Sequence, residues 1–474
     1  MQILQSFSSV LSKKSTFYFL LCIVGFITLL FFYINKDTLS GDHFTYLYYI
    51  KGMQQGRYSY WYFLKDYLPD TFRNPGFPGF LYLLSLVKDS ILFIKTIQLL
   101  LLFLTISFML KIIEHYENSL VLKNLFLIAI GINFVVLPYP AFIYPETLMM
   151  FLITLIVYVE LSLEEDTWKK IILLALLYGY CFQVRPVILF IPILRFLFFV
   201  YQYKKLSFIK NLTFIIIFIL TLLPYGFWNL KYHKQFRITP IEGGAGAMYL
   251  GYWSPKLINY KEEKYWRNVM YKDVLFNFED INTVPHNVEL FNNEMDSVDK
   301  ICSKYITPKD SVNMLVMKNY PHLFVTLNTQ YTNEREEILK SLAVKHYFQD
   351  WQYSLKLKTY TFFRLWYTSL SLEEKKDQPL IKQMPLIAAF VTTFSTLLLF
   401  IFYFLFCLWK RRDIIYTLLL PLFLCLYFDI FHVPFVIQSR YTIPVRMLYL
   451  FSLAFMIYKI HFSKNTTNES HQNI

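Results

Sequence analysis

The chain has 474 residues, of which 56% are hydrophobic and 20% aromatic. Several apolar runs are long enough to cross a hydrocarbon core of about 30 Å, and a soluble domain could not bury that many. The net charge of +13 comes from short basic clusters beside the apolar runs, which is the pattern of cytoplasmic loops and not of a nucleic-acid-binding patch. The sequence therefore predicts a polytopic α-helical protein of the plasma membrane, surrounded by the lipid bilayer and without a nucleic-acid partner.

The first two apolar runs differ in length and in the residues that precede them. Residues 17–34 follow Lys13 and Lys14 and lack a small-residue cleavage site, so we expect an uncleaved anchor that leaves the amino terminus in the cytoplasm. Residues 75–87, "PGFPGFLYLLSLV", are too few to span and begin with two Pro-Gly pairs. They predict a helix that lies flat on the outer surface.

The charges that flank the later runs predict about ten spans. Both termini are then cytoplasmic, and all basic clusters next to the spans fall on the cytoplasmic side. The predicted spans are residues 17–34, 91–113, 120–137, 147–159, two short helices within 171–203 separated at Arg185 and Pro186, 212–228, 386–409, 414–428 and 443–458. The clusters are Lys13, Lys14, Lys111, Lys123, Lys169, Lys170, Lys204, Lys205, Lys410, Arg411 and Arg412.

This topology divides the chain into three parts. Residues 1–230 hold seven spans and a first outer loop (35–90), residues 231–384 form an extracytoplasmic domain inserted before the last three spans, and residues 385–474 hold those spans and a cytoplasmic tail. The inserted domain is aromatic and of mixed charge, with helical patterning in 333–358. We expect it to be a small α/β or mostly helical domain.

Polar residues from separate outer loops share one face in this topology. Taken singly, these residues have ordinary explanations. Asp42 could be a helix cap, and Glu146 follows Pro145 at the start of a predicted helix, where the helix dipole stabilises an acidic side chain. Arg57 fits a contact with lipid headgroups. The outer candidates are Asp42, His43, Arg57, Arg73, Glu146, Arg185, Arg364, Asp429, His432 and Arg440.

The order of these motifs resembles the GT-C glycosyltransferases, and within them the branch of protein O-mannosyltransferases and the lipid A aminoarabinose transferase. An Asp at the exit of the first span is followed by Arg-x-Pro-Gly-aromatic-Pro, "PE" follows the third span, and "FQVRPVILFIP" is similar to the Arg-Pro hairpin of that branch. "FWNLKYHKQFRITPIEGGAGAMYLGY", with Gly243 and Gly244, resembles its entry to the soluble domain, and "MKNYPHLFV", "FFRLW" and "SRYTIPV" resemble later elements.

The resemblance covers nearly the whole chain in order, with two departures. A single acid, Asp42, is followed by His43 where many relatives carry two acids, and Arg73 with Asn74 stands where the aminoarabinose branch has Lys-Pro. The resemblance implies that residues 1–230 form a catalytic module. It also implies a sugar donor carried on polyprenyl phosphate and a reaction on the extracytoplasmic face.

Such a donor has a phosphate leaving group that is already an anion, so one carboxylate can suffice, unlike the paired acids of glycosidases. The resemblance implies that Asp42 is the catalytic base, which accepts the proton of the acceptor, and that the reaction inverts the anomeric carbon. Arg73, Arg185, Arg364 and Arg440 are the candidates for holding the phosphate. The remaining substrate-binding candidates are His43, Tyr46, Glu146 and Tyr441. No cofactor is firmly implied, although some members bind a divalent metal ion, for which Asp42 and Glu146 are the candidate ligands.

Two alternatives remain. A polysaccharide ligase or polymerase with a lipid-diphosphate donor would also have many spans and one large outer loop, but with its key residues in that loop. A lipid-glycan flippase would carry charges deep inside its spans, whereas here the spans hold few besides Lys95, Arg195 and Arg446. The sugar and the acceptor, whether protein, lipid or glycan, are not identified by the sequence.

Overall fold

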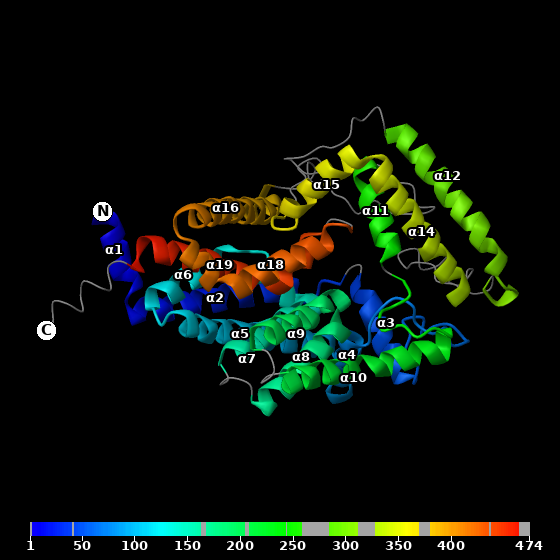
Figure 1. The fold of residues 1–474 in the computed structure, drawn as a ribbon, viewed down its shortest axis with the longest axis horizontal. Helices are drawn as coiled ribbons and strands as arrows, with labels where there is room; N and C mark the ends of the chain where they lie inside the picture. Colours follow the sequence, from blue (N-terminus) through cyan, green and yellow to red (C-terminus); the bar gives the residue numbers. More distant parts are fainter. Residues whose placement is uncertain are drawn as a thin grey trace.

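The computed structural model describes residues 2–39, 42–162, 167–203, 208–242, 244–257, 284–310, 328–368, 380–435 and 438–463. Within these ranges every regular element is a helix (Figure 1). Six of these helices are long and apolar enough to cross a membrane, and four shorter apolar helices accompany them. Both findings agree with a helical membrane protein. Lys204, Lys205, Gly243 and the 317–325 motif lie outside the described residues.

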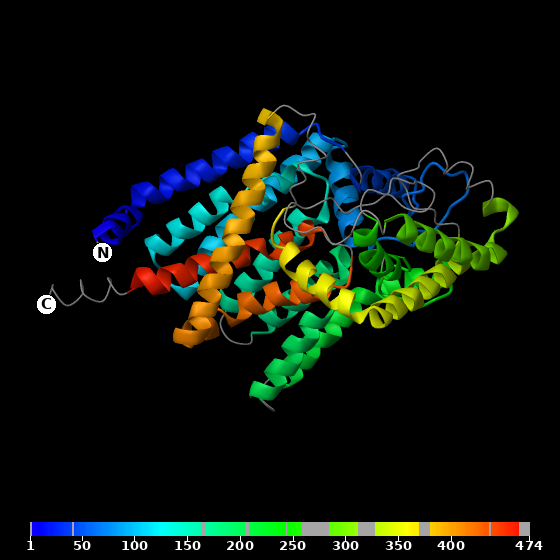
Figure 2. The same ribbon diagram turned by 90° about the horizontal axis from the view of Figure 1, so that it is seen from above.

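Helix α19 lies at the centre of the membrane bundle, and most of its side chains are buried. The helices in contact with α19 (Arg446–His461) are α5 (Ile91–Tyr116), α6 (Leu120–Ile132), α7 (Pro145–Ser162), α16 (Leu380–Lys410) and α18 (Leu419–His432). Around them lie α1 (Gln2–Leu11), α2 (Lys14–Asn35), α8 (Trp168–Val184), α9 (Phe190–Tyr203) and α10 (Phe208–His233) (Figure 2). Helix α2 exposes large apolar side chains such as Phe19, Phe26 and Tyr33, as expected of a helix that faces lipid.

The helix bounds confirm most predicted apolar segments and correct others. The hairpin at 171–203 breaks as predicted, into α8, the 3₁₀ turn η2 (Pro186–Ile188) and α9. The predicted span 120–137 is too long, because α6 ends at Ile132 and is followed by turns and the 3₁₀ helix η1 (Tyr139–Ala141).

Two late spans are also less regular than predicted. Residues 414–428 fall into α17 (Arg412–Thr417) and α18, which part at Leu418. Pro421 lacks the N–H that would bond to the carbonyl of Thr417. The span 443–458 begins within the 3₁₀ helix η6 (Ser439–Val445), which contains Pro444, before α19 starts. Proline therefore interrupts both segments without changing their apolar character.

Between α10 and α16 the chain forms a separate helical unit, which we call the cap. It consists of α11 (Ala245–Lys256), α12 (Val284–Cys302), the 3₁₀ helix η4 (Ser303–Tyr305) and α14 (Thr329–Gln349), and it has a hydrophobic core of its own, which includes Tyr249, Phe291 and Leu339. Helix α15 (Trp351–Arg364) leads back to the bundle (Figure 1). The described part of the predicted inserted domain is therefore helical, without strands.

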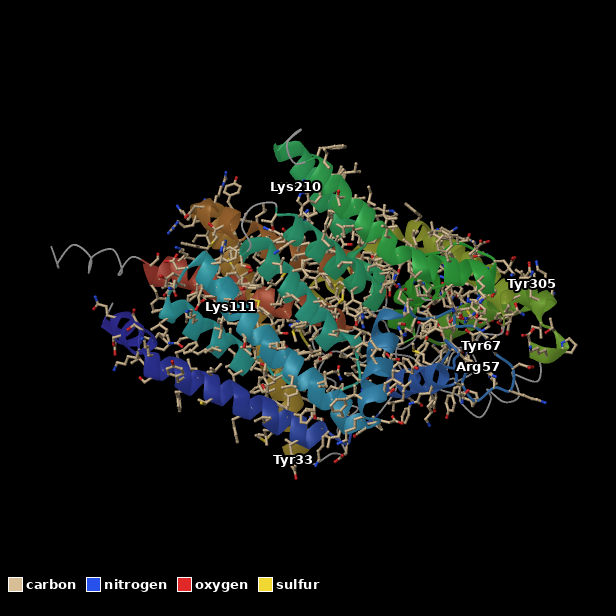
Figure 3. The ribbon with its side chains drawn as sticks, turned by 90° about the horizontal axis from the view of Figure 1, so that it is seen from below. Tyr33, Arg57, Tyr67, Lys111, Lys210 and Tyr305 are labelled. Carbon is tan, nitrogen blue, oxygen red and sulfur yellow. The ribbon has the colours of Figure 1, made fainter. Side chains whose placement is uncertain are left out.

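The cap lies at one end of the bundle, and helix ends joined by polar contacts lie at the other. There the Lys459 ammonium is 2.6 Å from the Glu117 carboxylate, which joins the ends of α19 and α5. Figure 3 shows Arg57 and Tyr67 beside the cap, Tyr305 within it, and Lys111 and Lys210 away from it.

Candidate functional site

A cavity of about 790 Å³ lies between the bundle and the cap. Its floor is the charged group Asp42, Arg73, Arg185 and Arg440, which come from four separate elements of the chain. Apolar side chains from α4 (Gly76–Val87), η2, α9 and α18 form one wall, including Phe77, Val187, Phe190 and Phe431. The opposite side, which we call the roof, is polar and comes largely from the cap. It includes Arg237, Glu242, Asn333, Glu336, Glu337 and Lys340.

Asp42 is the first residue of α3 (Asp42–Gln54), where a carboxylate is favoured by the helix dipole. A buried lysine supports the segment before it: Lys95 Nζ donates to the carbonyl oxygens of Lys36 (2.6 Å) and Thr38 (3.0 Å). The Asp42 carboxylate lies 2.9 Å from the Arg440 guanidinium and 3.9 Å from that of Arg73. Its side chain remains 32% exposed, so the cavity can reach it.

The electrostatics of Asp42 favour the ionised form. Burial alone would raise the pKa of its carboxyl, but the positive charges of Arg440 and Arg73 outweigh burial and lower the pKa to about 2. In the free protein, Asp42 is therefore a carboxylate held by cations.

Arg185 owes its place to the residue that follows it. Proline disfavours a helical conformation in the residue before it, and Arg185 has φ −150° and ψ 125°, so α8 ends at Val184. Its guanidinium lies 2.6 Å from the Glu146 carboxylate. The α4 helix approaches here so closely that a Cβ on Gly76 would lie 2.3 Å from the main chain of Gln183, which brings the Arg73 segment beside Arg185.

Glu146 lies beneath the floor and does not line the cavity. Its side chain is fully buried, 2.6 Å from the Arg185 guanidinium and 3.9 Å from Arg440 Nε. Arg440 therefore lies between Asp42 and Glu146 and contacts both carboxylates. This position suits Glu146 for orienting the two arginines, rather than for a direct contact with a substrate.

Aromatic rings surround the arginines. The Arg73 guanidinium carbon lies 5.5 Å from the centroid of the Tyr46 ring, and that of Arg185 lies 5.7 Å from the Tyr441 ring. His432 stacks on Tyr441 at 4.7 Å. Tyr46, Tyr441 and His432 line the cavity, whereas His43 is fully buried against Tyr144 and Phe142 behind it.

Arg364 and Asp429 belong to a different place in the fold. Arg364 Nη1 donates to the carbonyl of Tyr367 (2.5 Å), and Asp429 accepts a hydrogen bond from Trp366 Nε1 (2.8 Å). Buried Arg446 donates to the carbonyls of Leu365 and Trp366 at 2.9 and 2.5 Å. These contacts form a latch that fixes the end of α15 to the bundle, and none of the three side chains lines the cavity.

The arrangement does not fit a divalent metal ion held by Asp42 and Glu146. A guanidinium already lies between the two carboxylates, and three arginines nearby oppose a further positive charge. No group of three or more His, Cys, Asp or Glu side chains in the described ranges is placed to hold a metal ion. The carboxylates are neutralised by protein cations instead.

Sequence reasoning missed two groups of residues. Asp70, in the loop before Arg73, is fully buried and bonds to the main chain around Arg73. The polar face of α14 that forms much of the roof was also missed, although the i, i+3, i+4, i+7 spacing of Asn333, Glu336, Glu337 and Lys340 marks one helical face. That spacing could have indicated the roof, whereas a lone Asp in a polar loop gives no comparable signal.

Comparison with protein-family models, with curated proteins and with solved structures finds no match for this chain.

Proposed function

We propose that the protein is an inverting glycosyltransferase that moves a sugar from a polyprenyl-phosphate donor to an acceptor hydroxyl or amine. The observation that carries the proposal is the floor of the cavity. A partly exposed carboxylate, Asp42, lies there among three arginines, beside an apolar wall and below a polar roof. These surfaces match the three parts of the reaction, namely a phosphate, a lipid chain and a polar acceptor. The resemblance to the GT-C glycosyltransferases supports the same chemistry.

In the proposed reaction, the acceptor oxygen or nitrogen attacks the anomeric carbon from the side opposite the phosphate. The new bond to the acceptor forms as the bond from the anomeric carbon to the phosphate oxygen breaks, and the polyprenyl phosphate leaves with the bonding electrons. Asp42 takes the proton that the acceptor loses. Attack from the opposite face inverts the anomeric configuration.

The arginines supply the stabilisation that this reaction needs. Negative charge grows on the phosphate as it leaves, and guanidinium groups bind such charge with strong, directed hydrogen bonds. Arg73 and Arg440 hold Asp42 in the free protein, so a donor phosphate would compete with Asp42 for them. The donor itself would therefore free Asp42 and raise its pKa, which makes it a better base when the acceptor arrives.

The apolar wall supports a lipid donor. Phe77 and Pro78 belong to α4, the short apolar helix that the sequence predicts to lie flat on the membrane, and Phe190 begins α9. We assign the wall to the first isoprene units and the roof to the acceptor. Helices α6, α9 and α18 are shorter than a full span, and we count them, with α8 and the six long helices, toward the ten proposed spans.

The proposal places the cap outside the cell and both termini in the cytoplasm, because the basic clusters that flank the spans in the sequence are expected on the cytoplasmic side. Native Cys302 is buried in the cap core and cannot report this. We expect a cysteine at exposed Ser297 of α12, Ser297→Cys, to react with a membrane-impermeant maleimide in intact cells. A cysteine at exposed Ser9 of α1, Ser9→Cys, should react only after permeabilisation, and the reverse pattern would contradict the proposed orientation.

The reaction class is tested with purified protein in lipid nanodiscs. A panel of hexosyl and pentosyl polyprenyl monophosphates is compared with the matching diphosphates, and sugar transfer or release is measured together with the anomeric configuration of the product. We expect turnover of a monophosphate donor with inversion. Turnover of diphosphates alone would indicate a ligase or polymerase. Movement of a fluorescent donor between leaflets of proteoliposomes, without bond cleavage, would indicate a flippase.

A further inference from the structure

We propose that Asp70 is a positioning residue that holds Arg73 in place for the donor phosphate through the main chain of the loop that carries it. The inference rests on the proposed function, in which Arg73 contacts the phosphate. Asp70 itself is fully buried and does not line the cavity. Its action on the reaction would therefore be indirect.

The Asp70 carboxylate organises the segment in front of Arg73. Its Oδ2 accepts hydrogen bonds from the main-chain N–H groups of Phe72 (3.0 Å) and Arg73 (2.9 Å). Its Oδ1 accepts a hydrogen bond from the hydroxyl of Tyr49 (2.6 Å), which lies on α3, the helix that begins with Asp42. One carboxylate thus connects the backbone of an arginine of the floor to the helix that presents the proposed base.

The other side of Arg73 is held as well. Its carbonyl oxygen accepts hydrogen bonds from the hydroxyls of Tyr58 (2.7 Å) and Tyr225 (3.0 Å). The N–H and the carbonyl of Arg73 are therefore both held, by buried Asp70 and Tyr225 and by half-buried Tyr58. The guanidinium, 3.9 Å from Asp42, projects from a main chain with little freedom to shift, which is the preorganisation that a phosphate site requires.

The same loop connects the floor to the cap. His233 Nε2 lies 2.7 Å from the carbonyl oxygen of Asp70, and His233 Nδ1 lies 2.6 Å from the Thr329 hydroxyl at the start of α14. A carbonyl only accepts, so Nε2 carries the hydrogen and, in the neutral ring, Nδ1 accepts from Thr329. The Glu242 N–H also donates to the Thr71 carbonyl (2.8 Å). The Asp70 loop is therefore fixed between α3, α10 and the cap.

Keeping the carboxyl of Asp70 charged in this buried place costs free energy of folding. Burial raises the pKa of its carboxyl to about 6, although the hydrogen bonds from Tyr49 and from the main chain, and the charge of Arg73, oppose this. The other titratable groups that face it are Tyr58 and Tyr67 on the loop and Tyr225 and His233 on α10. Because the folded chain holds this proton more tightly than the unfolded chain, the Asp70 contribution to the free energy of unfolding falls as pH rises from about 4 to about 6. A neutral side chain would avoid this cost.

The test compares Asp70→Asn with Asp66→Asn, a control on the same loop whose exposed carboxylate lies 3.3 Å from Lys309. Full-length variants in nanodiscs are titrated with polyprenyl monophosphate without sugar, and the unfolding midpoint is measured at pH 7.5. We expect Asp70→Asn to bind on the order of tenfold more weakly, because charge-assisted hydrogen bonds to the Arg73 segment are replaced by weaker ones. Its unfolding midpoint should be unchanged or higher, and Asp66→Asn should match wild type in both measurements.

A second variant, Tyr58→Phe, removes one of the two hydrogen bonds to the Arg73 carbonyl and should weaken binding by a smaller factor. Asp70→Asn with wild-type affinity would overturn the positioning role, provided that Arg73→Ala loses binding. Weaker binding with a lower unfolding midpoint would assign Asp70 to stability alone and also overturn it. If wild type itself does not bind the lipid phosphate, the proposed function fails, and the inference fails with it.

Discussion

Asp42→Asn is expected to lower kcat by roughly 10²–10⁴-fold, the usual contribution of a positioned general base. The amide is nearly the same size but cannot take the proton of the acceptor. Removing the carboxylate also frees Arg73 and Arg440, which contact it in the free protein. Donor affinity should therefore stay the same or increase while kcat falls, and this separation of binding from turnover distinguishes a base from a structural carboxylate.

The measurements are steady-state turnover of the monophosphate donor and equilibrium binding of the lipid phosphate, both in nanodiscs. Asp413→Asn serves as the control, because Asp413 is an exposed carboxylate paired with Arg411. Turnover by Asp42→Asn at the wild-type rate would remove Asp42 from the chemistry. A loss of both turnover and lipid-phosphate binding would contradict the assignment of Asp42 as a base.

The pH dependence of wild type follows from the same contacts. With a pKa of about 2 in the free protein, Asp42 should cause no loss of kcat/KM on acidification until well below pH 4. Under the proposed function, a bound phosphate would compete for the arginines and raise the pKa of Asp42, so kcat should begin to fall at a higher pH than kcat/KM does. For stability the sign is the same: the depressed pKa contributes free energy of unfolding above about pH 4, and this contribution is lost as pH falls toward 2.

Arg440→Ala is expected to weaken binding of the lipid phosphate by about 10–100-fold, because hydrogen bonds to charged groups contribute about 1.5–3 kcal/mol each. Arg440 contacts both Asp42 and Glu146, so the variant also removes the main charge that keeps the Asp42 pKa low. Burial, which raises the pKa of Asp42, is then opposed by fewer positive charges, so the pKa increases. The acid limb of the kcat/KM profile should consequently move to higher pH.

Arg440→Lys separates charge from geometry, because lysine keeps the positive charge but cannot bridge two groups with a planar fork. Compared with Arg440→Ala, Arg440→Lys should bring the acid limb of the kcat/KM profile closer to that of wild type, while its affinity for the lipid phosphate should stay lower than that of wild type. Arg411→Ala is the control for the loss of an arginine, because Arg411 pairs with Asp413 at the surface and does not line the cavity. Binding and pH profiles that equal those of wild type would exclude Arg440 from the phosphate site.

The sequence predicted the helical class of the fold, the break at Arg185 and the short α4 helix, because long apolar runs and proline act locally. It did not predict where α6 ends or how α17 and α18 divide, since those bounds depend on turns and proline positions within segments that remain apolar. The sequence therefore predicted where apolar helices occur better than it predicted the residues at which they begin and end.

For the candidate site, the order of motifs placed Asp42, Arg73, Arg185 and Arg440 on one face, and the structure brings these four side chains to one floor. Arg364 was included because it lies in an aromatic segment on the same side. Its hydrogen bond to Tyr367 places it instead at the end of α15, since position along the chain says nothing of which loops meet. Asp70 was missed for the opposite reason, because its proposed role rests on hydrogen bonds to the main chain that residue type does not reveal.

The polar face of α14 and the charged floor come from different folding units, each with its own hydrophobic core. If the proposed function holds, substitutions at Asn333, Glu337 or Lys340 would change the acceptor while the arginines of the floor stay unchanged. Under the proposed function, a different cap could serve a different acceptor on the same membrane bundle, provided that the contacts of His233 and those at the end of α15 are kept.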